Sequence, residues 1–172
     1  FDLIYAGAQK NMGPAGTTLV VVKEDILGKV SRQIPSMMDY KVHISKSSMF
    51  NTPPVFAVYT SMLTLEWLKN LGGIPAIEEV NDKKARLLYS ELDLNPLFKG
   101  YAAKDDRSNM NATFTLQQDL KETFETMLKE GGINGLNGHR SVGGYRASMY
   151  NAMPLSSVAT LVEIMSELER KA

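Results

Sequence analysis

The first part of the chain alternates between strand-like runs and one long apolar run. Residues 1–6 are mostly apolar, and residues 17–22 are rich in β-branched side chains, which is typical of β-strands. Residues 7–16 between them contain Gly13, Pro14 and Gly16, which favour a tight, irregular turn. We therefore expect two strands joined by this turn, the first of them able to form a buried strand.

A helix is predicted over residues 55–70, where apolar side chains leave little polar face. A helix that is apolar nearly all round is typical of a buried position. Thr52 followed by Pro53 predicts the helix start, because a capping hydroxyl then precedes a proline at the first helical position. Before it we expect a short helix over 23–30 and an aperiodic segment over 31–54, long enough to be functional or part of an interface.

The pattern changes from residue 71 onward. An amphipathic helix is predicted over residues 74–92, with Ile77, Val80, Leu87 and Leu88 on one side. From about residue 93 the chain reads as α+β. The expected elements are a strand at 109–115, a helix from an Asp119 cap to Gly131, a strand at 145–150 and a last helix at 154–170.

Composition and charge exclude several classes of function. The 172 residues carry 19 basic and 19 acidic side chains, which argues against a partner made of nucleic acid or a membrane surface. No run approaches the roughly 20 apolar residues of a membrane span. Cysteine is absent, which excludes disulfides and zinc–thiolate sites and fits the cytoplasm, and we expect no metal site. The chain opens directly on a strand at Phe1, so we expect it to be a C-terminal fragment of a longer protein.

Lys10 is the first candidate for chemistry, because it lies in the turn between the two predicted strands. No acidic residue occurs from Leu3 to Lys23, so Lys10 has no local carboxylate to pair with. Apolar surroundings favour the neutral amine, which is the form that attacks an aldehyde to form a Schiff base. The alternative is a solvated surface lysine, as most lysines in turns are.

Asn51 and Thr52 are the second candidates. The N–H groups at a helix N-terminus are a ready site for an anion, and these two polar residues precede the predicted helix. The alternative is that they only cap the helix.

The third candidate group is His139, Arg140 and Arg146. Residues 131–154 contain no acidic residue, as is also true of residues 40–65 around Asn51 and Thr52. If these stretches converge in space, they form a pocket for anions, and guanidinium groups suit carboxylate and phosphate. The alternatives are a structural histidine and arginines that pair with distant carboxylates or reach solvent.

Three motifs together resemble the class V aminotransferases, which are pyridoxal 5'-phosphate enzymes. They are Gly-Ala-Gln-Lys-Asn-Met-Gly-Pro-Ala-Gly at 7–16, Asn-Thr-Pro-Pro at 51–54 and Gly-His-Arg-Ser-Val-Gly-Gly-Tyr-Arg-Ala-Ser at 138–148. The resemblance covers residues 1 to about 154. It implies an α/β, fold-type-I architecture. Residues 1–70 would be the end of the cofactor-binding large domain with the interdomain helix, and residues 71–172 would be an α+β C-terminal small domain.

The resemblance also implies roles for individual residues. Lys10 would bind the cofactor as a Schiff base and later move the proton between the substrate's Cα and the cofactor's C4′ carbon. Gln9 would lie beside the cofactor phosphate. Asn51 and Thr52 would reach across a homodimer to the cofactor phosphate of the neighbouring subunit.

Within this family, the third motif resembles that of members acting on phosphoserine. His139 and Arg140 would hold the substrate's phosphate or the side-chain carboxylate of glutamate, and Arg146 the α-carboxylate. The implied reaction converts 3-phosphohydroxypyruvate and glutamate to phosphoserine and 2-oxoglutarate, in serine biosynthesis in the cytoplasm. The alternatives are another class V aminotransferase, or a non-catalytic fragment or dimerisation module when the chain is isolated. We expect the isolated chain to be inactive, because several cofactor contacts would precede Phe1.

Overall fold

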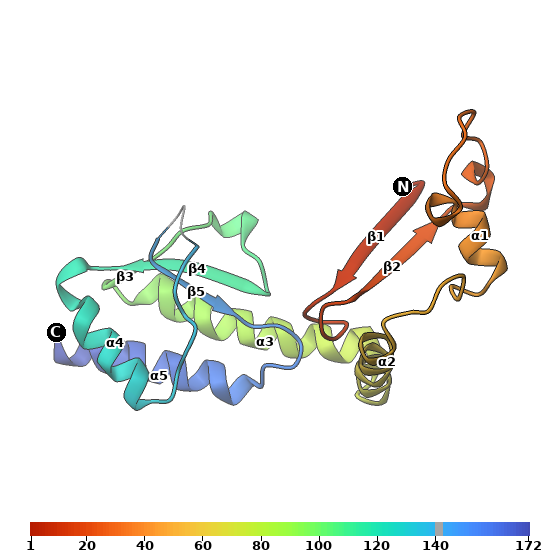
Figure 1. The fold of residues 1–172 in the computed structure, drawn as a ribbon. Coiled ribbons are helices and arrows are strands. Elements are labelled where there is room, and N and C mark those ends of the chain that lie inside the picture. The colour runs from red at the N-terminus through yellow and green to blue at the C-terminus, as the bar shows by residue number, and fades with distance from the viewer. Residues whose placement is uncertain (140–142) are drawn as a thin grey trace. The chain divides into compact units, whose positions relative to one another are not determined.

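The computed structural model describes residues 1–139 and 143–172 and contains two compact units. The first unit comprises Phe1–Asn70 and the second Leu71–Ala172 (Figure 1).

The first unit begins with an antiparallel hairpin of β1 (Leu3–Ala8) and β2 (Thr17–Val22). Leu3 lies opposite Val22, and Ala8 lies opposite Thr17, so both predicted strands are confirmed. The expectation that the first strand is buried is wrong for the described residues, since only Ala8 of β1 is buried. A hairpin of two strands buries little of its own surface, and a third strand or a packed helix must cover it.

The segment between the hairpin and the long helix contains short elements that its sequence did not predict. The helix expected over 23–30 is a single 3₁₀ turn, η1 (Glu24–Ile26). Gly28 follows with a φ of +73°, and this backbone angle is incompatible with a right-handed α-helix. The stretch predicted to be aperiodic contains η2 (Ser36–Met38) and α1 (Tyr40–Ser45). The Asp39 carboxylate accepts a hydrogen bond from the Lys41 N–H at 2.9 Å and caps α1, which is too short to reveal its period.

Helix α2 (Val55–Asn70) is confirmed in length, but Thr52 does not begin it. The Val58 N–H donates to the carbonyl of Pro54 at 3.1 Å, which makes Pro54 the residue that precedes the helix. The physical reason is the second proline, because a residue followed by proline is disfavoured in the helical conformation. Pro53 therefore cannot open the helix, and the predicted Thr52 cap is wrong.

The residues described here do not provide the burial that the apolar pattern of α2 indicates. Only Ala57 and Ser61 are buried in the helix. Most of its large apolar side chains are exposed, namely Val55, Phe56, Val58, Tyr59, Met62, Leu63, Leu65 and Trp67. An apolar surface of this extent is typical of an interaction surface.

The second unit has a three-stranded antiparallel sheet in the order β3-β4-β5. Its strands are β3 (Phe98–Gly100), β4 (Asn111–Leu116) and β5 (Tyr145–Ser148). Its helices are α3 (Gly73–Leu94), α4 (Lys121–Glu130) and α5 (Leu155–Lys171), with 3₁₀ turns η3 (Lys104–Asp106) and η4 (Gln118–Leu120). The helices lie on one side of the sheet (Figure 1). The α+β expectation is confirmed, except that β3 was not predicted and Leu120 rather than Asp119 precedes α4.

The core of the second unit lies between the sheet and its helices. Four aromatic rings meet there with centroids 5.2–5.9 Å apart, those of Phe98, Phe114, Phe124 and Tyr145. Successive strand residues point to opposite faces of a sheet. Since Tyr145 and Ala147 are buried in the core, Arg146 between them points to the opposite face.

Candidate active site

The turn that carries Lys10 is packed against helix α2. Gly13 and Gly16 have positive φ values of +118° and +130°, a backbone conformation that side chains disfavour. A Cβ atom on Gly16 would lie 2.8 Å from the Cβ of Ala57, and one on Gly13 would lie 3.0 Å from the Ser61 hydroxyl oxygen. The two glycines therefore permit the turn to approach α2 more closely than a residue with a side chain would.

Two hydrogen bonds hold the same turn. The Gly13 N–H donates to the Lys10 carbonyl at 3.3 Å, which closes the turn on the lysine itself. The hydroxyl oxygens of Thr17 and Ser61 lie 3.0 Å apart and join the first residue of β2 to α2. Lys10 is thus carried by a turn that is fixed to both strands and to the helix.

The surroundings of Lys10 match the alternative of a lysine that reaches solvent, because the side chains of Gln9 and Lys10 are both exposed. What the arrangement does supply is an accessible primary amine on a rigid turn. An aldehyde-bearing group can reach such an amine and form a Schiff base with it.

Asn51 and Thr52 lie in the segment that leads into α2, and both are exposed. The Asn51 side-chain amide donates to the Thr52 carbonyl at 3.0 Å. Although Thr52 does not cap the helix, both residues remain close in sequence to its N-terminus, where an α-helix leaves its first N–H groups without intrahelical acceptors. Their position therefore still suits an anion such as phosphate.

His139 and Gly143 lie shortly before β5, on either side of residues 140–142, which are outside the described residues. The Gly138 N–H donates to the Gly144 carbonyl at 2.9 Å, and the Gly143 N–H donates to the His139 carbonyl at 2.8 Å. Gly143 and Gly144 have φ values of +73° and +60°, which explains the glycine pair in the motif. His139 is exposed, and Arg140 lies outside the described residues.

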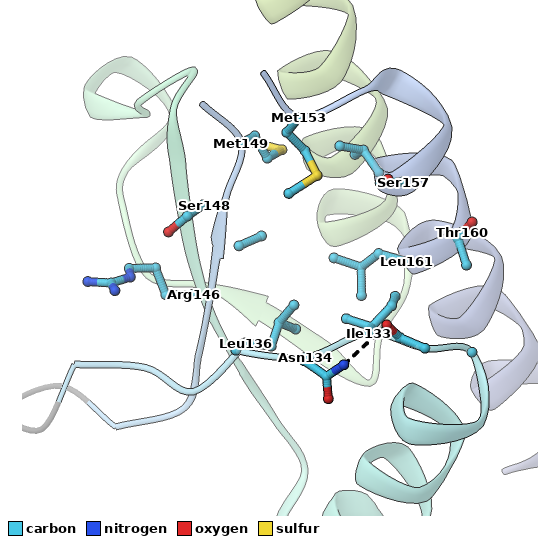
Figure 2. A pocket seen from close by; sticks show the side chains of 15 residues that line it. Ile133, Asn134, Leu136, Arg146, Ser148, Met149, Met153, Ser157, Thr160 and Leu161 are labelled. Atoms are coloured by element: carbon cyan, nitrogen blue, oxygen red, sulfur yellow. Dashed lines mark hydrogen bonds between the residues drawn. The ribbon is translucent and has the colours of Figure 1, made fainter. Parts of the chain in front are cut away.

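Arg146 lies in β5, opposite Thr113 of β4. Its N–H donates to the Leu136 carbonyl at 2.7 Å, so a second segment holds the strand along its other edge. The Arg146 side chain is exposed, and Figure 2 shows its guanidinium group pointing away from Met149 and Leu161. The guanidinium is accordingly available to an anion on the outer face of the sheet.

A pocket of about 530 Å³ lies beside β5, between residues 131–136 and the start of α5 (Figure 2). Its floor is mainly apolar, with Ile133, Met149 and Leu161. Arg146 is the charged residue of its lining, but the guanidinium group points away from the interior. This pocket therefore does not form the anion site that the sequence predicts.

The predicted residues divide between the two units. Gln9, Lys10, Asn51 and Thr52 belong to the first unit, and His139 and Arg146 to the second. In the part of the chain that the structure describes, no cluster of three or more metal-binding side chains occurs. None of the helices described here has the length and apolar character that crossing a membrane requires.

Sequence reasoning missed one residue, Lys84, whose side chain is fully buried in the second unit. A signal was available in the periodicity of α3. Lys84 follows Ile77 by seven positions and precedes Leu88 by four, and this spacing places it on the buried face of the helix.

Comparison with known proteins agrees with the motif resemblance. A family model described as aminotransferase class-V matches residues 1–161. A phosphoserine aminotransferase of Flavobacterium psychrophilum is 69% identical over 172 residues, covering 99% of this chain and 48% of that protein. The chain thus spans about half the length of the curated relatives it matches.

Solved structures give the same picture. A phosphoserine aminotransferase studied for radiation damage of its Schiff base has a TM-score of 0.91 and 46% identity, covering 100% of this chain and 48% of that chain. A phosphoserine aminotransferase of Trichomonas vaginalis with PLP bound has a TM-score of 0.86 and 36% identity, covering 96% of this chain and 48% of that chain.

Gly16→Ala is expected to destabilise the first unit. The new methyl group would meet Ala57 at a distance that real Cβ atoms do not adopt, in a backbone conformation that alanine disfavours. We expect a loss of about 2 kcal/mol in the free energy of unfolding. Trp67 is the single tryptophan and lies in α2, so its fluorescence during urea unfolding reports on this unit.

Gly7→Ala is the matched control. A Cβ on Gly7 would meet no heavy atom within 4 Å, so its unfolding midpoint should stay close to that of the unchanged chain. Equal midpoints for the two variants would contradict the close approach of the turn to α2.

Proposed function

Because the chain belongs to the class V aminotransferase family, we propose that it is the C-terminal part of an enzyme that transaminates 3-phosphohydroxypyruvate with glutamate. The products are phosphoserine and 2-oxoglutarate. The observation that carries this proposal is an accessible Lys10 on a turn anchored by glycines, within a motif of the same family. The names of its relatives support the choice of substrate.

Lys10 would hold the cofactor, pyridoxal phosphate, and would transfer the proton of the substrate's Cα. Bound there, the cofactor supplies a ring that withdraws electrons and stabilises negative charge at the substrate's Cα. The Lys10 amine would hold the cofactor through its aldehyde group. Once the substrate had freed it, the same amine would carry the proton that leaves the substrate's Cα, as a general base and then a general acid.

Gln9 would lie beside the cofactor phosphate, and Asn51 and Thr52 of the partner subunit in a homodimer would contact the same phosphate. Two observations support this arrangement. Both residues are exposed next to the N-terminus of α2, and α2 displays a broad apolar surface. Such a surface is suited to contact with other protein surface.

His139 and Arg140 bind the distal phosphate or carboxylate of the substrate, and Arg146 binds its α-carboxylate. Support comes from the absence of acidic residues over 131–154 and from the outward position of Arg146 on β5. A guanidinium group forms two parallel hydrogen bonds with a carboxylate, which fixes both the position and the orientation of the substrate. A class V aminotransferase with another acceptor would not need the His139–Arg140 pair.

We expect these 172 residues alone to be inactive and to act at most as a dimerisation module, because they span about half the length of the relatives they match. The complete enzyme works in the cytoplasm on small molecules. The absence of cysteine fits this location.

Lys10→Ala in the complete enzyme is expected to abolish transamination, because both the attachment point and the proton carrier are lost. An Asn51→Ala/Thr52→Ala variant should also be strongly impaired. Mixing the two variants under conditions of subunit exchange should restore activity, to about a quarter of that of the unchanged enzyme. The reason is that a mixed dimer has one site with Lys10 from one subunit and intact Asn51 and Thr52 from the other.

The activity of the mixture is measured against each variant alone at the same total concentration. Near-normal turnover by Lys10→Ala would remove Lys10 from the mechanism. An impaired pair of variants that gives no recovery on mixing would place Asn51 and Thr52 in the same subunit as the lysine they serve.

The roles of Arg140 and Arg146 can be distinguished by comparing substrates with and without a distal anion. Arg140→Ala should impair phosphoserine and glutamate, which carry a distal anion, and spare the poor substrate alanine. Arg146→Ala should impair all three, because every amino acid has an α-carboxylate. Losing such a charge-assisted contact costs about 2–4 kcal/mol, or on the order of 30- to 1,000-fold in kcat/KM.

The measured quantity is the ratio of kcat/KM for phosphoserine to that for alanine. This ratio should fall sharply in Arg140→Ala and change little in Arg146→Ala. Equal ratios in the two variants would contradict the assignment of the distal anion to Arg140.

A further inference from the structure

Lys84 of α3 is a buried cation that the proposed reaction does not use. Its side chain is 0% exposed. The ammonium group donates hydrogen bonds to three main-chain carbonyls, those of Met149 at 3.0 Å, Tyr150 at 2.9 Å and Met153 at 3.1 Å. Among the residues that the structure describes, no carboxylate lies within ion-pair distance of Lys84.

A buried ammonium group of this kind is held by its three acceptors. Burial lowers the pKa of Lys84 because it penalises the charged form. Hydrogen bonds from a charged donor are stronger than those between neutral groups, and all three donors of the ammonium have an acceptor here. Without Lys84, three carbonyls in or beside the core would each lose a hydrogen bond, and that of Tyr150 would keep the one from the Met153 N–H at 2.9 Å.

These carbonyls belong to the turn that follows β5. Arg146 lies three residues before Met149, or about 10 Å along an extended chain. The Met149 N–H donates to the Met110 carbonyl at 2.8 Å, which continues the pairing of β5 with its neighbour. One turn before Lys84 on α3, the Asn81 amide donates to the Asn151 side-chain oxygen at 2.9 Å. Helix α3 therefore holds this turn at two points.

We propose that Lys84 is a positioning residue for Arg146: through the three carbonyls it fixes the end of β5 and thereby the place of the guanidinium group. This role deepens the proposed function, because it rests on the assignment of the α-carboxylate to Arg146. β5 has only four residues, so its direction depends on how firmly its end is held. A shift of the strand displaces the arginine from the carboxylate it binds.

The first test measures amide hydrogen exchange in the complete enzyme. Lys84→Met keeps a linear side chain and removes the cation and its donors. Exchange over residues 143–153 should become faster in Lys84→Met than in Leu92→Ala, a control that opens a cavity eight residues further along α3 and removes no side-chain hydrogen bond. Equal exchange in the two variants, compared at equal distance below their melting temperatures, would overturn the positioning role.

The second test measures steady-state kinetics with glutamate. Lys84→Met should raise KM on the order of 10- to 100-fold with a smaller effect on kcat, because a misplaced binding group weakens substrate binding. Leu92→Ala should leave KM close to that of the unchanged enzyme. Faster exchange with an unchanged KM would make Lys84 a stabilising residue only and would overturn the proposal.

The two tests also separate this inference from the proposed function. An unchanged enzyme that transaminates no amino acid would refute the proposed function, and the exchange data would still decide whether Lys84 holds the end of β5. Should Lys84→Met not fold, Asn81→Ala removes the other anchor of the same turn. It should change exchange and KM in the same direction by a smaller factor, and no change in either would overturn the proposal.

Discussion

The close approach of the Lys10 turn to helix α2 is the contact on which the rest of the first unit depends. The hairpin has two strands and buries almost none of its own side chains. Gly13 and Gly16 bring the turn into contact with Ser61 and Ala57, which are the buried residues of α2. This contact gives an exposed lysine a fixed location, which a reacting amine needs if it is to meet the same atom in every cycle.

In the second unit the equivalent constraint is the alternation of side chains along β5. Tyr145 and Ala147 point into a core of aromatic rings, and this leaves Arg146 on the outer face of the sheet. Hydrogen bonds from neighbouring segments hold the strand along its edge and at its end. The core thus stabilises the unit and at the same time sets the direction of a candidate binding group.

The elements with a continuous apolar or β-branched run, or with a clear hydrophobic period, were the ones that the sequence predicted. The strand at Thr17–Val22 and the helix at Val55–Asn70 match in both ends, since turn residues or prolines flank each of them. The Thr52 cap was wrong because a second proline at 54 excludes Pro53 from the helix. The sequence did not indicate what covers α2, because an apolar pattern reveals an apolar surface without revealing which part of a protein covers it.

In the candidate site, too, some features could be predicted from the sequence and others could not. Motifs predicted which residues carry chemistry, and the structure adds how they are held, through the positive φ angles of Gly13, Gly16, Gly143 and Gly144. The exposure of Lys10 is the alternative that the sequence left open, because an acid-free stretch excludes local ion pairs and says nothing about local burial. Lys84 was missed because a lysine on an amphipathic helix is usually a solvated residue.

The central claim, that Lys10 is the residue which binds the cofactor, can be tested directly by reduction and peptide mapping. The complete enzyme, loaded with pyridoxal phosphate, is treated with borohydride, which makes a Schiff base permanent, and the modified lysine is located by mass spectrometry. We expect one stoichiometric modification, on Lys10. A modification located on another lysine, or none in an enzyme that transaminates, would contradict it.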